Sequence, residues 1–90
     1  MDGEAAETLA LEALAFLASD ERRLGALLAQ AGWTLPELRA GLADSHVLAG
    51  ILDFVLSDER LLVAFCEVSG CGPETPMRAR RALPGSGFEG

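Results

Sequence analysis

Two cysteines and one histidine are the residues of this 90-residue sequence whose types most often serve in nucleophilic catalysis. A catalytic cysteine needs a base within reach, and the base needs a third group that orients it. His46 lies 20 residues before Cys66, which stands in an apolar stretch, and Cys71 follows a glycine. We expect Cys66 to be a small core residue and His46 a solvated residue in the first turn of a helix. The sequence predicts that the protein is not an enzyme.

The spacing of the two cysteines is not that of a Cys-x-x-Cys pair. It suggests no disulfide framework, and two reduced thiols of a cytoplasmic protein are the simplest interpretation.

Two acidic pairs, Asp20-Glu21 and Asp58-Glu59, could supply oxygen ligands to a hard cation. Each pair is followed by its own arginine, and the sequence has no Asp-rich loop. It also has no Gly-rich loop of the kind that cradles phosphate between a strand and a helix. We therefore expect no metal and no cofactor.

Three arginines, Arg78, Arg80 and Arg81, form the single basic cluster of a chain whose net charge is −7. They are either a solvated helix face that pairs with the acidic body, or a docking patch for an acidic partner. An acidic chain without lysine and without aromatic residues among its arginines predicts no binding of nucleic acid or of anionic membrane surfaces.

Two aromatic residues are further candidates for partner binding. Trp33 follows Gly32, where a glycine helix end often returns the next apolar side chain to its own helix. The alternative is a partly exposed anchor at an interface, because tryptophan is enriched there. Phe88 has no helix to pack on and is either disordered or part of a short recognition motif.

The elements that must position these residues follow from a doubled segment. Phe-x-x-Ser-Asp-Glu-Arg occurs at Phe16 and again 38 residues later at Phe54. Serine is a favoured N-cap, and acidic residues are favourable in the first turn of a helix. Each copy therefore predicts a helix end, a sharp turn capped by Ser19 or Ser57, and a new helix that ends at Gly32 or Gly70.

The sequence predicts an all-α fold, a compact orthogonal bundle of five to six short helices built from two similar halves of about 38 residues. The halves cover about 9–43 and 47–83 of a single domain, 1–83, and 84–90 is expected to be a flexible tail. The helices are expected at about 4–18, 20–31, 35–43, 45–56, 58–69 and 74–83. Thr34 and Glu37 have the capping-box pattern for the third of these helices, and Asp44 is expected to cap the fourth. The predicted core consists of Leu9, Leu14, Phe16, Leu17, Leu24, Leu27, Leu28, Leu38, Leu48, Ile51, Leu52, Val55, Leu62, Phe65 and Val68.

Three stretches carry a resemblance to a known group: LALEALAFLASDERRLGALLAQAGW, LDFVLSDERLLVAFC and the closing RARRALPG. The chain resembles a family of short bacterial proteins that form a domain of unknown function, over about residues 5–85. Members often have proline and an acid after the cap of the fourth helix, where this chain has Ser45 and His46. The resemblance implies a small cytoplasmic helical protein and brings no catalytic residues.

The predicted function is that of a non-catalytic protein–protein interaction or regulatory module with an unidentified protein partner. Two alternatives stay open. One is a homo-oligomeric structural protein, in which the partner is a second copy. The other is a binder of small apolar ligands or a cryptic enzyme, which requires a cavity of roughly 300 Å³ or more between the halves. The start of the chain has no signal-peptide pattern, and no apolar stretch is long enough for a membrane span, so we expect no membrane association.

Overall fold

The structure is a computed structural model and describes residues 1–84 of the chain. Within this range six helices follow one another without a strand: α1 (Gly3–Ala18), α2 (Glu21–Ala31), α3 (Leu35–Ala40), α4 (Ser45–Leu56), α5 (Glu59–Ser69) and α6 (Glu74–Ala82). This arrangement confirms the all-α prediction. The clearest difference in length is at α3, which ends at Ala40, three residues before the expected end, because Gly41 is a poor continuation of a helix.

The residues that cap α2 and α5 differ from the prediction. Asp20 and Asp58 are the N-caps, and their carboxylates accept hydrogen bonds from the backbone N–H groups of Arg22 and Arg60 at 2.9 Å. The predicted caps, Ser19 and Ser57, instead end the preceding helices. Each serine hydroxyl donates to the carbonyl three residues before it, at 2.7 Å. Aspartate is the N-cap because its carboxylate accepts hydrogen bonds from backbone N–H groups of the first turn. Its negative charge is also stabilised by the positive end of the helix dipole.

The other predicted helix signals are confirmed. Thr34 and Glu37 form a reciprocal capping box at the start of α3, and Asp44 caps α4. Gly32 and Gly70 end α2 and α5 with φ angles of 77° and 79°, a left-handed conformation that glycine adopts without steric cost. The two copies of the doubled segment therefore have closely matching backbone conformations at their cap and at their end.

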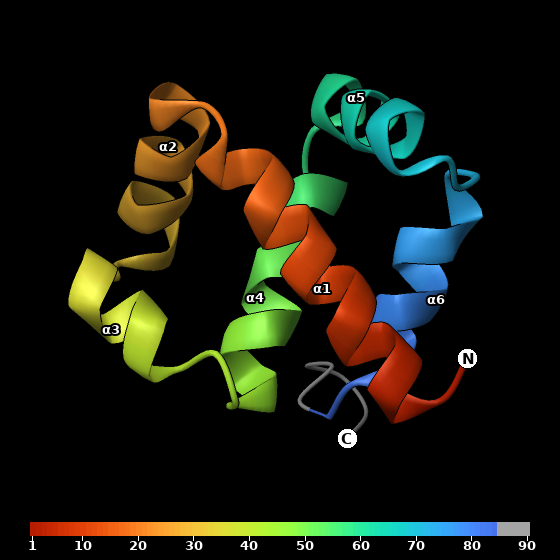
Figure 1. The fold of residues 1–90 in the computed structure, drawn as a ribbon, viewed down its shortest axis with the longest axis horizontal. Coiled ribbons are helices and arrows are strands. Elements are labelled where there is room, and N and C mark those ends of the chain that lie inside the picture. Colours follow the sequence, from red (N-terminus) through yellow and green to blue (C-terminus); the bar gives the residue numbers. More distant parts are fainter. Residues whose placement is uncertain (85–90) are drawn as a thin grey trace.

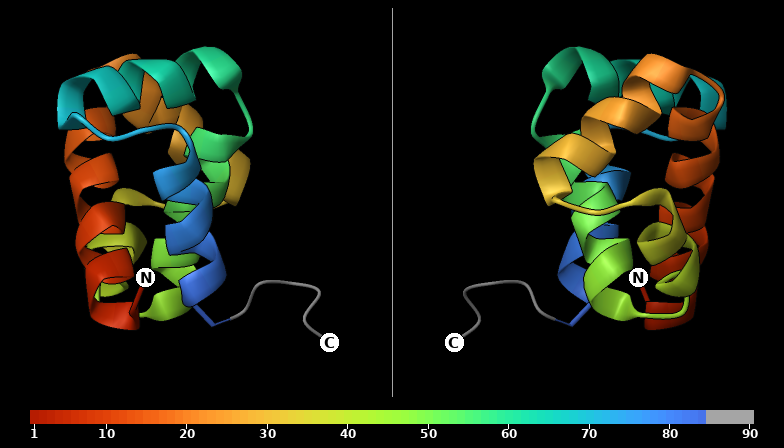
Figure 2. Two further views of the ribbon diagram at one scale, coloured as in Figure 1. Left: turned by 90° about the vertical axis from the view of Figure 1, so that its right-hand side faces the viewer. Right: turned by 90° about the vertical axis from the view of Figure 1, so that its left-hand side faces the viewer.

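Three helices, α1, α4 and α6, pack against one another and form the body of the domain (Figure 1). Figure 2 shows α1 on one side of the molecule, α4 and α6 on the other, and α5 lying across their ends at a steep angle. In sequence order α3 corresponds to α6, but it packs much less extensively on the other helices. Within residues 1–84, no helix is both long and apolar enough to cross a membrane.

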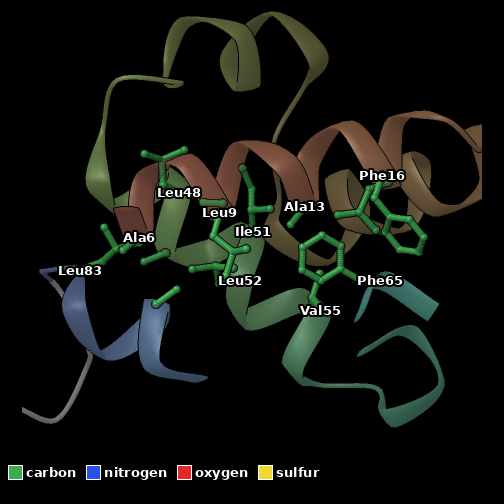
Figure 3. Close-up of a cluster of buried hydrophobic side chains, with 14 of the residues drawn as sticks. Ala6, Leu9, Ala13, Phe16, Leu48, Ile51, Leu52, Val55, Phe65 and Leu83 are labelled. Atoms are coloured by element: carbon green, nitrogen blue, oxygen red, sulfur yellow. The ribbon is translucent and has the colours of Figure 1, made fainter. Parts of the chain in front are cut away.

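The core lies between α1 and α4 and is closed by residues of α5 and α6 (Figure 3). Leu14, Leu24, Leu28 and Leu62, four of the predicted core residues, are only partly buried at its edge. Val68, which lies on α5, is not a core residue, because it is 72 % exposed. The buried cluster consists of Ala6, Leu9, Ala10, Ala13, Phe16, Leu17, Leu27, Leu38, Leu48, Ala49, Ile51, Leu52, Val55, Phe65, Ala79 and Leu83.

Candidate functional site

The three arginines of α6 do not form one surface patch. Arg80 packs along the body of the domain with its side chain 15 % exposed, and its Nε donates to Asp53 Oδ1 of α4 at 2.6 Å. Arg78 and Arg81 are exposed. Arg80 thus makes the intramolecular pair that one of the two sequence interpretations proposed. A docking surface on α6 would have to rest on Arg78 and Arg81 alone.

Trp33 is half-buried at the end of α2 and packs against the core. Its backbone N–H and that of Gly32 both donate to the carbonyl of Leu28, at 3.0 and 2.9 Å, and this turn returns Trp33 toward its own helix. The indole also reaches α4, where a Cβ added to Gly50 would lie 2.9 Å from its Cη2 atom. Glycine at position 50 therefore leaves the room that the indole occupies.

A hollow of about 300 Å³ opens beside Trp33 and is also lined by Asp53 and Phe54. We call it the Trp33 hollow. Asp53 forms part of its wall and is the ion-pair partner of Arg80, so this one residue of α4 borders the Trp33 hollow and also binds Arg80. Phe88, the remaining sequence candidate, lies outside the described residues.

A second hollow lies between the end of α1, the start of α2 and α5, and has a volume of about 550 Å³. We call it the aromatic groove. The rings of Phe16 and Phe65 meet at its base, with their centroids 5.6 Å apart and their planes inclined by 56°. The guanidinium of Arg23 lies 4.6 Å from the centroid of Phe16, within cation–π range. The exposed Val68 adds apolar surface at the edge.

A third hollow, of about 320 Å³, lies between α2 and α5 and is lined by Arg22, Arg23, Arg60, Asp58 and the apolar side chains Ala26, Phe54 and Leu61. We call it the arginine groove. It shares Arg23 with the aromatic groove and Phe54 with the Trp33 hollow. The three hollows therefore follow one another along α2, from its first turn to the residues that end it.

The arginines of this groove come from both copies of the doubled segment. Arg22 and Arg60 each follow an Asp-Glu pair at the start of a helix, α2 or α5. The acids are favourable at this positive end of the helix dipole, but arginines at the same place are not. Within residues 1–84, no carboxylate lies within ion-pairing distance of Arg22, Arg23 or Arg60. Helix formation thus explains the acids of the repeated segment but does not explain its arginines.

This site could not be identified from the sequence, although two of its arginines belong to the doubled segment. Arg22 and Arg60 are 38 positions apart, and only the packing of α2 and α5 over the ends of α1 and α4 places them on one groove. Their unfavourable position in the helix dipole was the one signal available in the sequence.

The two cysteines lie closer together than the sequence suggested. Their Sγ atoms are 3.6 Å apart, and both thiols are free. Cys66 is buried, as predicted, and this burial, together with the neighbouring Cys71 and Glu74, raises its pKa from 9.0 to about 11. The Cys66 thiol therefore stays protonated at neutral pH.

His46 and the acidic residues are the remaining candidates from the sequence for catalysis or metal binding. His46 is exposed in the first turn of α4, and its backbone N–H donates to Asp44. Among residues 1–84, no three or more histidine, cysteine, aspartate or glutamate side chains converge as a metal site.

Comparison with known proteins gives a family match. The profile of a family described as "Protein of unknown function (DUF3572)" matches residues 3–86. No curated protein and no solved structure matches the chain. The matched range includes all six helices and the three hollows along α2, and it confirms the resemblance to a small domain family without an assigned function.

Proposed function

Because the chain belongs to DUF3572, a family of proteins of unknown function, we propose its role from its own surface. It is a non-catalytic protein-interaction module. Its ligand is an acidic segment of another protein that carries an apolar anchor residue. The carboxylates of the segment pair with Arg22, Arg23 and Arg60 in the arginine groove, and its apolar residue enters the adjacent aromatic groove.

The observation that carries this proposal is a cluster of three arginines, none of which has a carboxylate of residues 1–84 within ion-pairing distance, in a chain with twice as many acidic as basic residues. Clustered arginines commonly recognise acidic segments, because the guanidinium fork binds a carboxylate through two parallel hydrogen bonds. The negative charge of the rest of the protein repels such a segment elsewhere, so it favours this one groove.

The neighbouring apolar surface supplies the second part of recognition. Phe16 and Phe65 are already held against each other, so an entering side chain orders few additional groups. Aromatic residues and arginine are the types that contribute most binding free energy at protein interfaces. A site of this size buries less surface than a standard stable interface, and we expect a transient complex with a dissociation constant of roughly micromolar order.

We also infer that the doubled segment is an internal repeat and that each of its two copies contributes an arginine to the arginine groove. The matching conformations at Asp20 and Asp58, with φ of −136° at both residues, support this inference. Arg22 and Arg60 occupy equivalent positions after these caps and line the groove from its two sides. A repeat thus provides a simple route to a pair of converging arginines.

The test compares two double variants of the full chain. Arg22→Ala/Arg60→Ala removes cations from the arginine groove, and Arg78→Ala/Arg81→Ala removes the same charge from the exposed face of α6. The probe is a displayed library of peptides that combine acidic residues with one central leucine or phenylalanine. Selected peptides are then measured by fluorescence anisotropy at two salt concentrations.

We expect the wild type and the α6 variant to select the same acidic peptides, and the groove variant to lose at least about tenfold in affinity, which corresponds to about 1.4 kcal/mol. Binding to the wild type should weaken at the higher salt concentration. The proposal is wrong if no acidic peptide is selected, or if both double variants bind equally well. Selection of the chain's own segments would favour a second copy as the partner.

The volume of the aromatic groove favours a second candidate function, the binding of a small apolar ligand. Its volume of about 550 Å³ exceeds the roughly 300 Å³ that this alternative requires. Ala15 lies exposed at the groove, so Ala15→Leu fills part of it without entering the core. A panel of small aromatic and aliphatic compounds tests this candidate by thermal shift. A compound that stabilises the wild type and not Ala15→Leu supports it, and no shift with any compound contradicts it.

A further inference from the structure

The pair of thiols at the junction of α5 and α6 is unrelated to the proposed partner binding and has an arrangement of its own. Cys66 lies in the last turns of α5, and Cys71 follows the left-handed Gly70 that ends this helix. The N–H of Gly70 donates to the carbonyl of Cys66 at 2.8 Å, so the chain reverses and returns the next side chain to the helix. This reversal places the two sulfur atoms 3.6 Å apart.

We propose that Cys66 and Cys71 form a thiol–disulfide exchange site that reacts with small-molecule disulfides of the glutathione class. The sulfur atoms need to approach by about 1.5 Å to reach the length of a disulfide bond. Cys71 already donates its S–H to Cys66, so the two side chains point toward each other before any reaction.

The same helix end occurs earlier in the chain without cysteines. Leu28 and Trp33 hold the corresponding positions around Gly32, and their turn has nearly the same backbone angles. The turn therefore does not require cysteines for its formation. The two facing thiols at the second turn could form a disulfide, whereas the first turn has no cysteine.

The environment of the thiols sets the order of reaction. Cys71 is partly exposed, so a small disulfide can reach its sulfur, to which the hydroxyl of Ser69 donates at 3.1 Å. Cys66 is only 8 % exposed, and its Sγ donates to the carbonyl oxygen of Gly72 over a distance of 3.6 Å. The raised pKa of Cys66 keeps it protonated while Cys71 reacts.

In the first step the Cys71 thiolate attacks one sulfur of the small disulfide, and the other half leaves as a thiolate that takes up a proton. In the second step Cys66 gives up its proton and attacks the Cys71 sulfur, which releases the second half as a thiol. Two electrons pass from the two cysteines to the small disulfide. The products are an intramolecular Cys66–Cys71 disulfide and two molecules of the small thiol.

The experiment equilibrates the reduced full-length chain with mixtures of reduced and oxidised glutathione, quenches with acid and measures the intact mass. We expect the folded wild type to lose the mass of two hydrogen atoms and to retain no free thiol. Cys66→Ala should stop at the Cys71–glutathione mixed disulfide, whose mass is higher by one glutathionyl group. Cys71→Ser should react at least about tenfold more slowly, because only the buried thiol remains.

A parallel titration in denaturant tests whether the fold brings the thiols together. The ratio of oxidised to reduced protein gives the effective concentration of one thiol at the other, and we expect it to be at least about tenfold higher in the folded chain than in the unfolded chain. An equal or lower value in the folded chain would overturn the proposal. A wild type that stays reduced, stops at the mixed disulfide or forms only disulfide-linked dimers also overturns it, and these outcomes need no variant.

Discussion

Asp53 and Arg80 join α4 to α6 through a hydrogen bond of 2.6 Å between Nε and Oδ1. The side chain of Arg80 is mostly buried, so its aliphatic part also packs against the body of the domain. We expect Arg80→Ala to lower the free energy of unfolding by about 1–2 kcal/mol, because it removes both contributions. Arg78→Ala removes an exposed charge from the same helix and should change it by less than about 0.5 kcal/mol. Equal effects in urea denaturation would show that Arg80 has no structural role.

The caps of α2 and α5 allow a comparison of adjacent residues. The Asp58 carboxylate accepts from the N–H groups of Arg60 and Leu61, at 2.9 and 3.4 Å, whereas the Ser57 hydroxyl donates to a carbonyl of the preceding helix. We expect Asp58→Ala to cost about 1 kcal/mol and Ser57→Ala about half of that or less. Thermal unfolding of the two variants measures the difference. A larger loss for Ser57→Ala would restore serine as the principal cap.

Phe16 and Phe54 occupy equivalent positions in the doubled segment but differ in burial. Phe16 is 8 % exposed and contacts Phe65, whereas Phe54 is partly buried and lines the arginine groove. Phe16→Ala should cost about 3–5 kcal/mol and Phe54→Ala about 1–2 kcal/mol. The doubled sequence by itself gives no reason for unequal losses, because it does not show that Phe16 is buried against Phe65 and that Phe54 is only partly buried. Chemical denaturation that finds equal losses would contradict the difference in burial.

Replacement by alanine should have different consequences at two helical glycines, Gly25 and Gly50. A Cβ at Gly25 in α2 meets no atom within 4 Å, so Gly25→Ala should stabilise the protein by about 0.5–1 kcal/mol through helix propensity. At Gly50 the added Cβ would lie 2.9 Å from Cη2 of Trp33 and must displace the indole. We expect Gly50→Ala to expose Trp33 and shift its fluorescence to longer wavelength. Trp33 is the one tryptophan of the chain, so the emission reports this position alone. Unchanged emission would place the indole elsewhere.

The raised pKa of Cys66 predicts a loss of stability at alkaline pH. Its thiol ionises near pH 9 in the unfolded chain and near pH 11 in the folded protein, because burial disfavours the thiolate. The unfolded chain therefore loses this proton first, and the contribution of Cys66 to stability falls as the pH rises from about 9 to 11. Denaturation of the wild type and of Cys66→Ala, both under reducing conditions, isolates this slope from other titrations. A steeper decline in the variant would have the wrong sign.

Capping residues made the helices predictable, because Asp44, Thr34 with Glu37, and the two glycines act through their nearest neighbours in sequence. The position of individual side chains in the folded domain was harder to predict from the sequence. Val68 has the spacing of an inward residue, yet the crossing of α5 over the ends of the other helices leaves it in solvent. Arg80 could not be separated from Arg78 and Arg81 without knowing that Asp53 lies opposite it. The arginine groove required two helix starts to be brought together, which no local pattern encodes.

The packing of α1 against both α4 and α6 has a consequence for the order of events during translation. α1 emerges from the ribosome before α6, and its buried residues, among them Ala6, Leu9 and Ala10, are covered in part by α6. Until α6 emerges, a nascent chain that already carries five of these helices presents an uncovered apolar strip along α1. Such a strip is what chaperones bind and what promotes association between unfinished chains. The domain should thus become compact late, and release of α6 should be the step that ends its exposure to the quality-control machinery of the cell.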